Sequence, residues 1–312
     1  MTAILAGLGA AALWAAATLC SSRSSRMLGS RVVLAWIMIV GVAIGLPIAV
    51  ASPPPSTFAP STFALLFLAG TCYVVGLQLT YAALRVGKVS IVAPIVSTEG
   101  AVAALVSVAL GDPIGVIAGV MLVAIALGVV LSSVDRARPE VAAGDFDLTA
   151  DAIDEPAPAP SVPPVAQGAA EPPADARRTA TLAIAAALLF GVGIVAAGRS
   201  ALLVPVSWVA LSARLIGIVG VVIPLLIQRR LRLSRAALPL VVIAGAGEVL
   251  GSMLSAWGSR ESIAITAVMG SQFAALAAVA AFLLFGERLA RVQLVGVVLI
   301  VAGVTVLAGV SA

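Results

Sequence analysis

Long, almost uninterrupted apolar runs separated by short polar segments make up most of the chain. Ten runs can be counted, at residues 2–21, 31–51, 61–84, 89–110, 113–134, 179–199, 203–227, 236–258, 261–285 and 289–310. A bilayer core is roughly 30 Å thick and needs about 20 apolar residues to be crossed by a helix. The runs are continuously apolar rather than alternating, which favours spanning helices over the strands of a barrel.

Residues 135–178 have a different composition from everything around them. They are rich in Pro, Ala and acidic residues and nearly free of aromatic ones. Such a segment cannot bury enough apolar area to fold, so we predict a disordered linker. It divides the chain into residues 1–134 and 179–312, each with five of the apolar runs.

The two parts repeat one another at a constant offset of 175 residues. The matched pairs are Gly70/Gly245, Gly76/Gly251, Arg85/Arg260, Gly111/Gly286, Asp112/Glu287 and Gly128/Gly303. Because five spans is an odd number, the second copy must be inverted in the membrane, as in many secondary transporters. The sequence thus predicts an all-α polytopic membrane protein whose ten transmembrane helices form two inverted five-helix repeats.

Composition narrows the classes of function. The chain is 62% hydrophobic and only 10% charged, which excludes an ordinary soluble protein. Histidine is absent and there are two cysteines, so we expect no metal and no cofactor. No P-loop and no nucleophile–base set is present, which argues against an enzyme. The basic residues lie between the spans, so the net charge of +4 does not indicate a nucleic-acid partner.

The distribution of Lys and Arg predicts the orientation. Fifteen lie in or beside the loops after odd-numbered runs, and two, Arg199 and Arg260, after even-numbered runs. Cytoplasmic loops carry the excess of Lys and Arg. We therefore expect a multi-pass protein of a bacterial-type inner membrane, with the linker in the cytoplasm and both termini outside.

Several segments resemble one family of transporters. GERLARVQLVGVVLIVAGVTVLA, residues 286–308, resembles the end of each repeat in the EamA-type drug/metabolite transporter family. GDPIGVIAGVMLVAIALGVVL, from Gly111, is a weaker copy. ARLIGIVGVVIPLL, residues 213–226, resembles that family's second helix, with Arg214 ten residues before Pro224. The resemblance implies ten helices in two inverted repeats and export or exchange of small molecules. The family usually has cytoplasmic termini, unlike the orientation that the charges predict here.

Three ionisable residues fall near the middle of predicted spans: Glu99, Arg214 and Glu248. Such residues usually face the protein interior or a wet cavity and are functional. Two carboxylates and one guanidinium leave one negative charge, which a proton or a cationic substrate would neutralise. The alternative is a structural pair of Arg214 with one acid, which leaves the other acid unexplained. At the offset of 175, Glu99 matches Ala274 and Glu248 matches Tyr73, so the acids are not equivalent positions.

Further residues are candidates for the lining of a site. Gln78 and Tyr81 lie on one stripe of the third run, and Gln272 lies near the middle of the ninth. Trp14 and Tyr73 are deep enough to form an apolar or cation-attracting wall, with core packing as the alternative.

Two more features are candidates for gating or for structure. Pro94 frees the carbonyl of Ser90 and kinks its helix, which suits a gate or a tolerated structural kink. Gly286 ends one helix, and Glu287 complements the dipole of the next.

The combined hypothesis is a secondary transporter working by alternating access. It would export or exchange a small metabolite, an organic cation or a zwitterion, with proton coupling through Glu99 and Glu248. Arg214 would tune these acids or hold a substrate carboxylate. The partners expected are the substrate and the bilayer, with the chain a monomer or a homodimer. The alternative is a non-transporting membrane scaffold that acts through its acidic linker.

Overall fold

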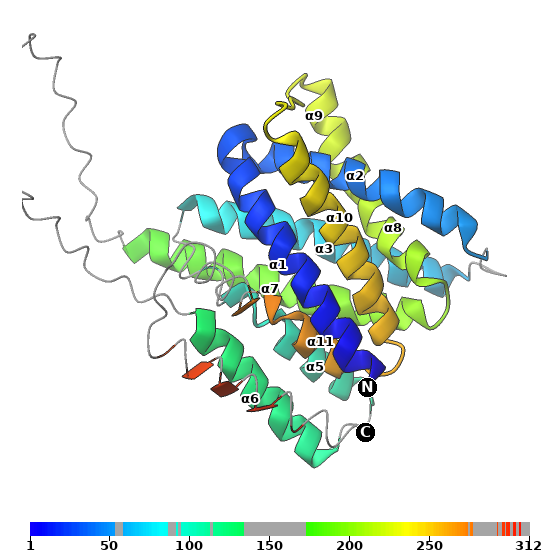
Figure 1. The fold of residues 1–312 in the computed structure, drawn as a ribbon, viewed down its shortest axis with the longest axis vertical. Helices are drawn as coiled ribbons and strands as arrows, with labels where there is room; N and C mark the ends of the chain where they lie inside the picture. Colours follow the sequence, from blue (N-terminus) through cyan, green and yellow to red (C-terminus); the bar gives the residue numbers. More distant parts are fainter. Residues whose placement is uncertain are drawn as a thin grey trace, which may run out of the picture.

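The computed structural model describes residues 1–53, 59–86, 95–112, 115–133 and 173–273, with isolated positions elsewhere. Its elements are α1 (Thr2–Leu28), α2 (Ser30–Ala51), α3 (Pro60–Val86), α5 (Glu99–Ala109), α6 (Val116–Ser133), α7 (Pro173–Ala201), α8 (Val206–Gly217), a π-helical turn (Ile218–Val222), α9 (Ile223–Ile227), α10 (Leu238–Gly258) and α11 (Ile263–Gly270). Figure 1 shows their arrangement. Within the described ranges, helices are the only regular elements.

Six stretches are long and apolar enough to span a bilayer, counting only the described residues. They are Thr2–Ser25, Ser30–Ala51, Pro60–Thr80, Arg177–Ala201, Val206–Ile227 and Leu238–Gly258. These correspond to the first three and the sixth to eighth apolar runs of the sequence. The prediction of an all-helical, multi-pass membrane protein is confirmed. The total of ten spans and the inversion of the repeats stay predictions.

The predicted domain division is only partly visible. Residues 134–172 lie outside the described part of the chain. Helix α7 begins at Pro173 and so includes the last six residues of the predicted linker. The apolar run marks only the part of α7 that suits the membrane, whereas the helix extends into a polar first turn.

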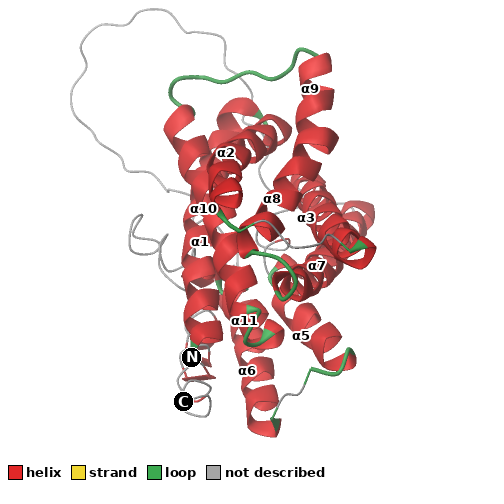
Figure 2. Cartoon of the chain, turned by 90° about the vertical axis from the view of Figure 1, so that its right-hand side faces the viewer, coloured by secondary structure: helices red, strands yellow, loops and turns green. Residues whose placement is uncertain are grey.

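Helix pairing places four long helices around the centre of the molecule. α3 packs along α7, α1 packs along α10, and α2 packs on both α8 and α10. α1 and α10 are antiparallel, because Gly258 meets Ala6 while Gly247 meets the carbonyl of Leu13. Figure 2 shows α3 and α7 side by side and α1 beside α10. Glycine at these contacts lets the backbones approach closely.

The predicted run at 89–110 is interrupted near its middle. Ser97 and Thr98 form a turn, and Glu99 is the first residue of α5. The Thr98 hydroxyl donates to the Ile95 carbonyl at 2.7 Å, which competes with the helical backbone pattern. The ninth run is broken within one residue of the equivalent place. There Ser271 and Gln272 form a turn after α11, and the Ser271 hydroxyl donates to the Val268 carbonyl. The run at 89–110 therefore does not form the single helix that its length predicts.

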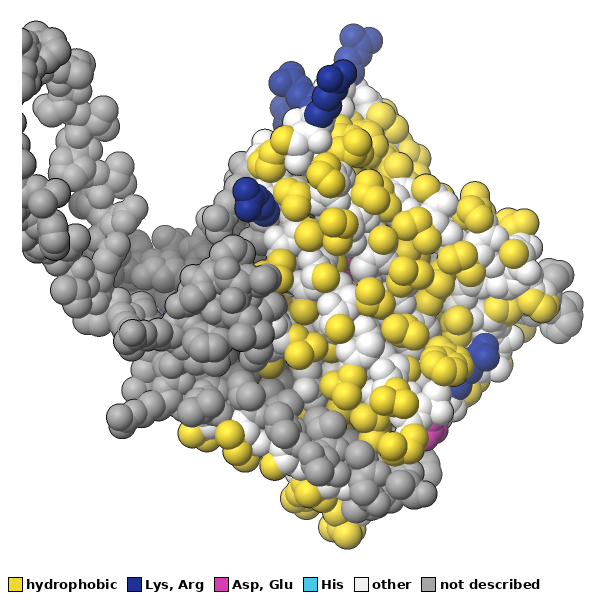
Figure 3. Space-filling view, viewed as in Figure 1, with side chains coloured by type: hydrophobic (Ala, Val, Ile, Leu, Met, Phe, Trp, Pro, Cys, Tyr) yellow, Lys and Arg dark blue, Asp and Glu magenta, His cyan; other side chains and the backbone are white. Residues whose placement is uncertain are grey.

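The outer surface of the helices is mainly apolar. Figure 3 shows hydrophobic side chains over the broad middle of one face, with basic side chains gathered at the end beyond α9. Arg229, Arg230, Arg232 and Arg235 lie in the segment between α9 and α10, and all four are exposed. An apolar belt next to a basic end is the surface expected of a protein in a bilayer.

We predict that Gly100→Ala lowers stability. A Cβ at Gly100 would lie 2.6 Å from both the Ala267 carbonyl oxygen and the Ser271 hydroxyl oxygen, where α5 crosses α11. Overpacking of this kind costs about 1–3 kcal/mol. The measurement is the apparent melting temperature of the purified protein in detergent. Gly220→Ala is the matched control, since a Cβ added at that position would meet nothing within 4 Å. Equal melting temperatures for both variants would contradict the tight crossing.

Candidate functional site: a central cavity with two carboxylates

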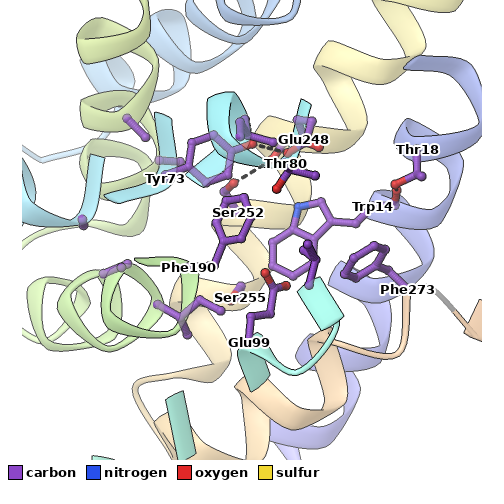
Figure 4. A pocket seen from close by; sticks show the side chains of 18 of the residues that line it. Trp14, Thr18, Tyr73, Thr80, Glu99, Phe190, Glu248, Ser252, Ser255 and Phe273 are labelled. Atoms are coloured by element: carbon purple, nitrogen blue, oxygen red, sulfur yellow. Dashed lines mark hydrogen bonds between the residues drawn. The ribbon is translucent and has the colours of Figure 1, made fainter. Parts of the chain in front are cut away.

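A cavity of ≈ 540 Å³ lies between α1, α3, α7, α8, α10 and the break before α5. Figure 4 shows its central part. Its described lining is mostly apolar, with hydroxyl side chains and two acids, and contains neither Lys nor Arg. The volume is in the range of pockets that hold small organic molecules. Both parts of the chain contribute, since Trp14, Tyr73 and Glu99 come from the first and Phe190 and Glu248 from the second.

Glu99 lines the cavity from the start of α5. Its side chain is buried, at 7% exposure, and no described residue forms a hydrogen bond with its carboxylate. Figure 4 shows the carboxylate pointing toward the Trp14 indole. The helix dipole favours a negative charge at an amino-terminal position. A cavity-lining carboxylate that forms no hydrogen bond with the described residues is available to a ligand or a proton.

Glu248 approaches the same cavity from the middle of α10. The Tyr73 hydroxyl donates a hydrogen bond to its Oε2, and the Ser252 hydroxyl donates to its backbone carbonyl at 2.7 Å. Glu248 and Glu99 are close enough to interact electrostatically. Tyr73 and Glu248 are also the matched positions at the offset of 175, so this bond joins corresponding points of the two parts of the chain.

Arg214 is fully buried on α8, behind the cavity wall. Its Nη2 donates to the Ser252 hydroxyl at 2.9 Å, and its Cζ lies 4.7 Å from the centroid of the Tyr73 ring. Its Nε and Nη1 have no hydrogen-bond partner among the described residues. Within that part of the chain Arg214 forms no ion pair, although it interacts electrostatically with Glu248. The close structural pair weighed as an alternative is therefore not formed.

Two aromatic residues occupy matching places on opposite walls. Trp14 of α1 lies against Gly251, where a Cβ would come within 2.7 Å of the indole Nε1. Phe190 of α7 lies against Gly76, with a corresponding distance of 2.8 Å to Cε1. Phe190 also meets Tyr73 edge-on, with ring centroids 6.1 Å apart. The matched glycines of the repeat thus make room for one large ring on each side.

The other predicted site residues do not gather at the cavity. Gln272 is buried, and its described side-chain hydrogen bond goes to the Met269 sulfur, at 3.7 Å. Gln78 is exposed on α3, and neither residue is part of the cavity lining. The side chain of Tyr81 lies outside the described residues, as do Pro94, Gly286 and Glu287. Gln272 and Gln78 lie at suitable depth along their runs, but depth does not fix the direction in which a helical side chain points.

The sequence also contains a signal for the cavity that depth and charge do not capture. Lining residues that the sequence analysis did not identify include Phe190 and Phe273, and also Thr18, Ser21 and Ser25 of α1. With Trp14 these α1 residues recur at intervals of four, three and four, which places them on one helix face. A polar stripe on an otherwise apolar helix is the available indication that this face borders a cavity.

One end of the cavity is closed by packing and polar contacts. Leu66, Ala201, Val204, Val209 and Ala256 form a buried cluster there. Arg260 ties α10 to the segment after α7 through the carbonyls of Ala201, at 2.7 Å, and Val204, at 3.2 Å.

Beside that cluster, Arg199 of α7 bonds Asp112 at 2.6 Å. Toward the opposite end, the lining residues Ser21, Ser25, Ser30 and Thr80 are partly exposed. The cavity is thus sealed on the side of Arg260 and more open on the side of the basic segment after α9.

The site has the chemistry of a binding cavity. Among the described residues no group of three or more His, Cys, Asp or Glu could hold a metal ion. The polar groups of the described lining are carboxylates and hydroxyls, and they lie among aromatic and aliphatic side chains. They can bind, orient and neutralise a small molecule.

Comparison with known proteins agrees with the fold and the resemblance noted above. Residues 1–134 match the model of the EamA-like transporter family. Sixteen chains of solved structures are similar. One of them, described only as "Crystal structure of protein", has a TM-score of 0.71 and 17% identity over 98% of this chain and 95% of its own. No curated protein sequence matches. The resemblance read from the sequence is confirmed by the family match, and the structural similarity concerns the fold.

We predict that Ser252→Ala destabilises the protein. The variant removes the acceptor of the hydrogen bond that Arg214 donates to a side chain, leaving a buried guanidinium without that partner. Loss of a bond to a buried charged group costs about 1–3 kcal/mol. Thermal unfolding in detergent measures the effect. Ser255→Ala, one turn further along α10, is the control, since only the backbone carbonyl of Ser255 is bonded by a described side chain. A drop of the same size in both variants would show that Arg214 does not depend on Ser252.

Proposed function

We propose that this chain, with its match to the EamA-like transporters, is a secondary transporter that moves a small molecule through the central cavity by alternating access. The observation that carries the proposal is the pair of acids in that cavity, one from each part of the chain. Acids inside a membrane are costly and usually mark a substrate or proton pathway. Binding of a proton or of a cationic substrate at Glu99 and Glu248 would be the coupling step.

Helix packing supports two repeats related by a pseudo-twofold axis. At the offset of 175, α1 corresponds to α7 and α3 to α10. Replacing each helix of the packed pair α3–α7 by its counterpart therefore gives α10–α1, which is also a packed pair. The same replacement converts the packed pair α2–α10 into α8–α3, which is packed as well. A cavity at the interface of inverted repeats, bordered by broken helices, is the arrangement on which alternating access depends. The breaks at Ser97–Thr98 and Ser271–Gln272 lie within one residue of equivalent places.

The unequal ends of the cavity support alternating access as well. The sealed end combines an apolar cluster with one ion pair and two bonds to carbonyls, contacts that can break and reform. The partly exposed end lies near the arginines after α9, which the excess of basic residues assigns to the cytoplasm. The structure would then be the inward-facing state of an inner-membrane protein, and opening of the sealed end would give the outward-facing state.

Proton-dependent flux should require both acids. We expect Glu99→Gln and Glu248→Gln, singly and together, to abolish substrate flux driven by a pH gradient, because a neutral amide cannot exchange a proton. The measurement is uptake into proteoliposomes containing the purified full chain. Glu261→Gln is the matched control, since that acid is 45% exposed outside the cavity and bonds the amino-terminal residues. Undiminished flux in the double variant would remove the mechanism.

The sealed end should loosen when its ion pair is removed. In a chain lacking Cys20 and Cys72, we introduce Ser259→Cys, because Ser259 lines the cavity beside Arg260 and is only 4% exposed. A water-soluble maleimide is added on the Asp112 side of the membrane. Asp112→Asn should raise the rate at which it labels this cysteine about fivefold, because a partly exposed ion pair contributes roughly 1 kcal/mol to closure. The same substitution should not speed labelling from the opposite side. Labelling unchanged by Asp112→Asn would contradict the role of this contact in closure.

A further inference from the structure

We infer that the cavity takes an organic cation with an apolar body and excludes molecules that carry a carboxylate. This inference rests on the proposed transport function and names the substrate class of the same site. From the sequence alone, Arg214 is equally suited to hold a substrate carboxylate, and a zwitterion is as good a candidate as a cation. The position of Arg214 relative to Tyr73 separates these alternatives.

The ionisable side chains that line the cavity, among the described residues, are acids. Glu99 and Glu248 both line it, and no described lining residue carries a positive charge. The Glu99 carboxylate has no hydrogen-bond partner among the described residues, whereas Glu248 is held by Tyr73. A ligand cation would therefore supply the missing partner of Glu99, with Glu248 near enough to add its charge. A ligand carboxylate would meet two acids and, among the described lining residues, no cation.

Tyr73 screens Arg214 from the cavity. The guanidinium lies over the face of its ring, with Cζ 4.7 Å from the ring centroid, and its hydroxyl donates to Glu248. Tyr73 lines the cavity and Arg214 does not, so the ring covers the guanidinium on the side that a ligand would approach. On another side α2 comes close, because a Cβ at Gly41 would lie 2.8 Å from Cδ and 3.0 Å from Nε of Arg214. The residue is 0% exposed. Its positive charge offsets the acids from behind without offering a hydrogen bond to a ligand.

Aromatic rings surround the acids. Trp14, Tyr73, Phe190 and Phe273 all line the cavity, and Figure 4 shows Glu99 between the Trp14 and Phe190 sides. The indole Nε1 of Trp14 is buried without a hydrogen-bond partner among the described residues, so this ring presents mainly its apolar and π-electron surface. Cations are attracted to the faces of such rings, and carboxylates are not. Rings and carboxylates together favour an ammonium group on an apolar body.

The test uses two probes that differ only in a carboxylate. These are phenethyltrimethylammonium and N,N,N-trimethylphenylalanine, which keeps the same ring and quaternary ammonium. Binding to the purified full chain in nanodiscs is measured by isothermal titration calorimetry. We expect saturable binding of the cation and at least about tenfold weaker binding of its carboxylated counterpart. No saturable binding of the cation, or equal or tighter binding of the zwitterion, would overturn the inference without recourse to any variant.

Variants then locate the binding. Glu99→Gln and Trp14→Leu should each weaken cation binding about tenfold, in line with the loss of a charge partner or a cation–π contact. Glu261→Gln, the exposed acid, should not change it. Tyr73→Ala should narrow the difference between the two probes by uncovering Arg214, whereas Tyr73→Phe keeps the ring and should preserve it. A Tyr73→Ala chain that discriminates as strongly as the unmodified chain would show that Tyr73 does not screen Arg214.

Flux of the same cation into proteoliposomes separates this inference from the proposed function. Selective, Glu99-dependent binding without any cation flux would refute transport and leave the substrate class of the site intact. If proton-coupled flux of another solute depended on Glu99 while the cation did not bind, the transport function would be upheld and the proposed substrate class, an organic cation, would be refuted. The two proposals can therefore fail independently.

Discussion

The centre of this protein is organised by one buried positive charge, the guanidinium of Arg214. Burying an unpaired cation in a membrane protein is unfavourable, so its surroundings must offset it. Here the compensation comes from the Tyr73 ring, the Ser252 hydroxyl and the charge of Glu248 one layer further on. Each of these residues is on a different helix from Arg214, so the charge fixes α3, α8 and α10 relative to one another.

That arrangement depends on glycine where helices meet. Gly41 leaves room for the Arg214 side chain, and Gly76 and Gly251 leave room for Phe190 and Trp14. The last two glycines are matched positions of the internal repeat, which explains why they pack equivalent rings on opposite walls. The chemistry at matched positions of the sequence is not the same: Tyr73 and Glu248 are such a pair, one a phenol and the other an acid, and the two bond each other.

The sequence was informative wherever a signal is carried by length or by rare residues. Apolar runs of spanning length predicted six helices that the structure describes, and the mid-run charges predicted both acids of the cavity. It failed where direction matters. Gln78 and Gln272 lie at suitable depth but do not line the cavity, and Glu99 begins a helix instead of lying in the middle of one. The Ser–Thr–Glu–Gly segment at 97–100 resembles a helix start, but the apolar residues around it obscured that signal.

The sequence by itself therefore determined the class of protein, the six spans that the structure describes and the two acids of the cavity, because composition and spacing are properties of the chain alone. Only the tertiary structure decided which face of each helix borders the cavity. In a helix that is apolar all round, periodicity does not specify that face. The tertiary structure also decided that Arg214 lies against the Tyr73 ring and is not part of the cavity lining. The orientation of a buried charge is set by its neighbours on other helices, and no spacing along the chain encodes it.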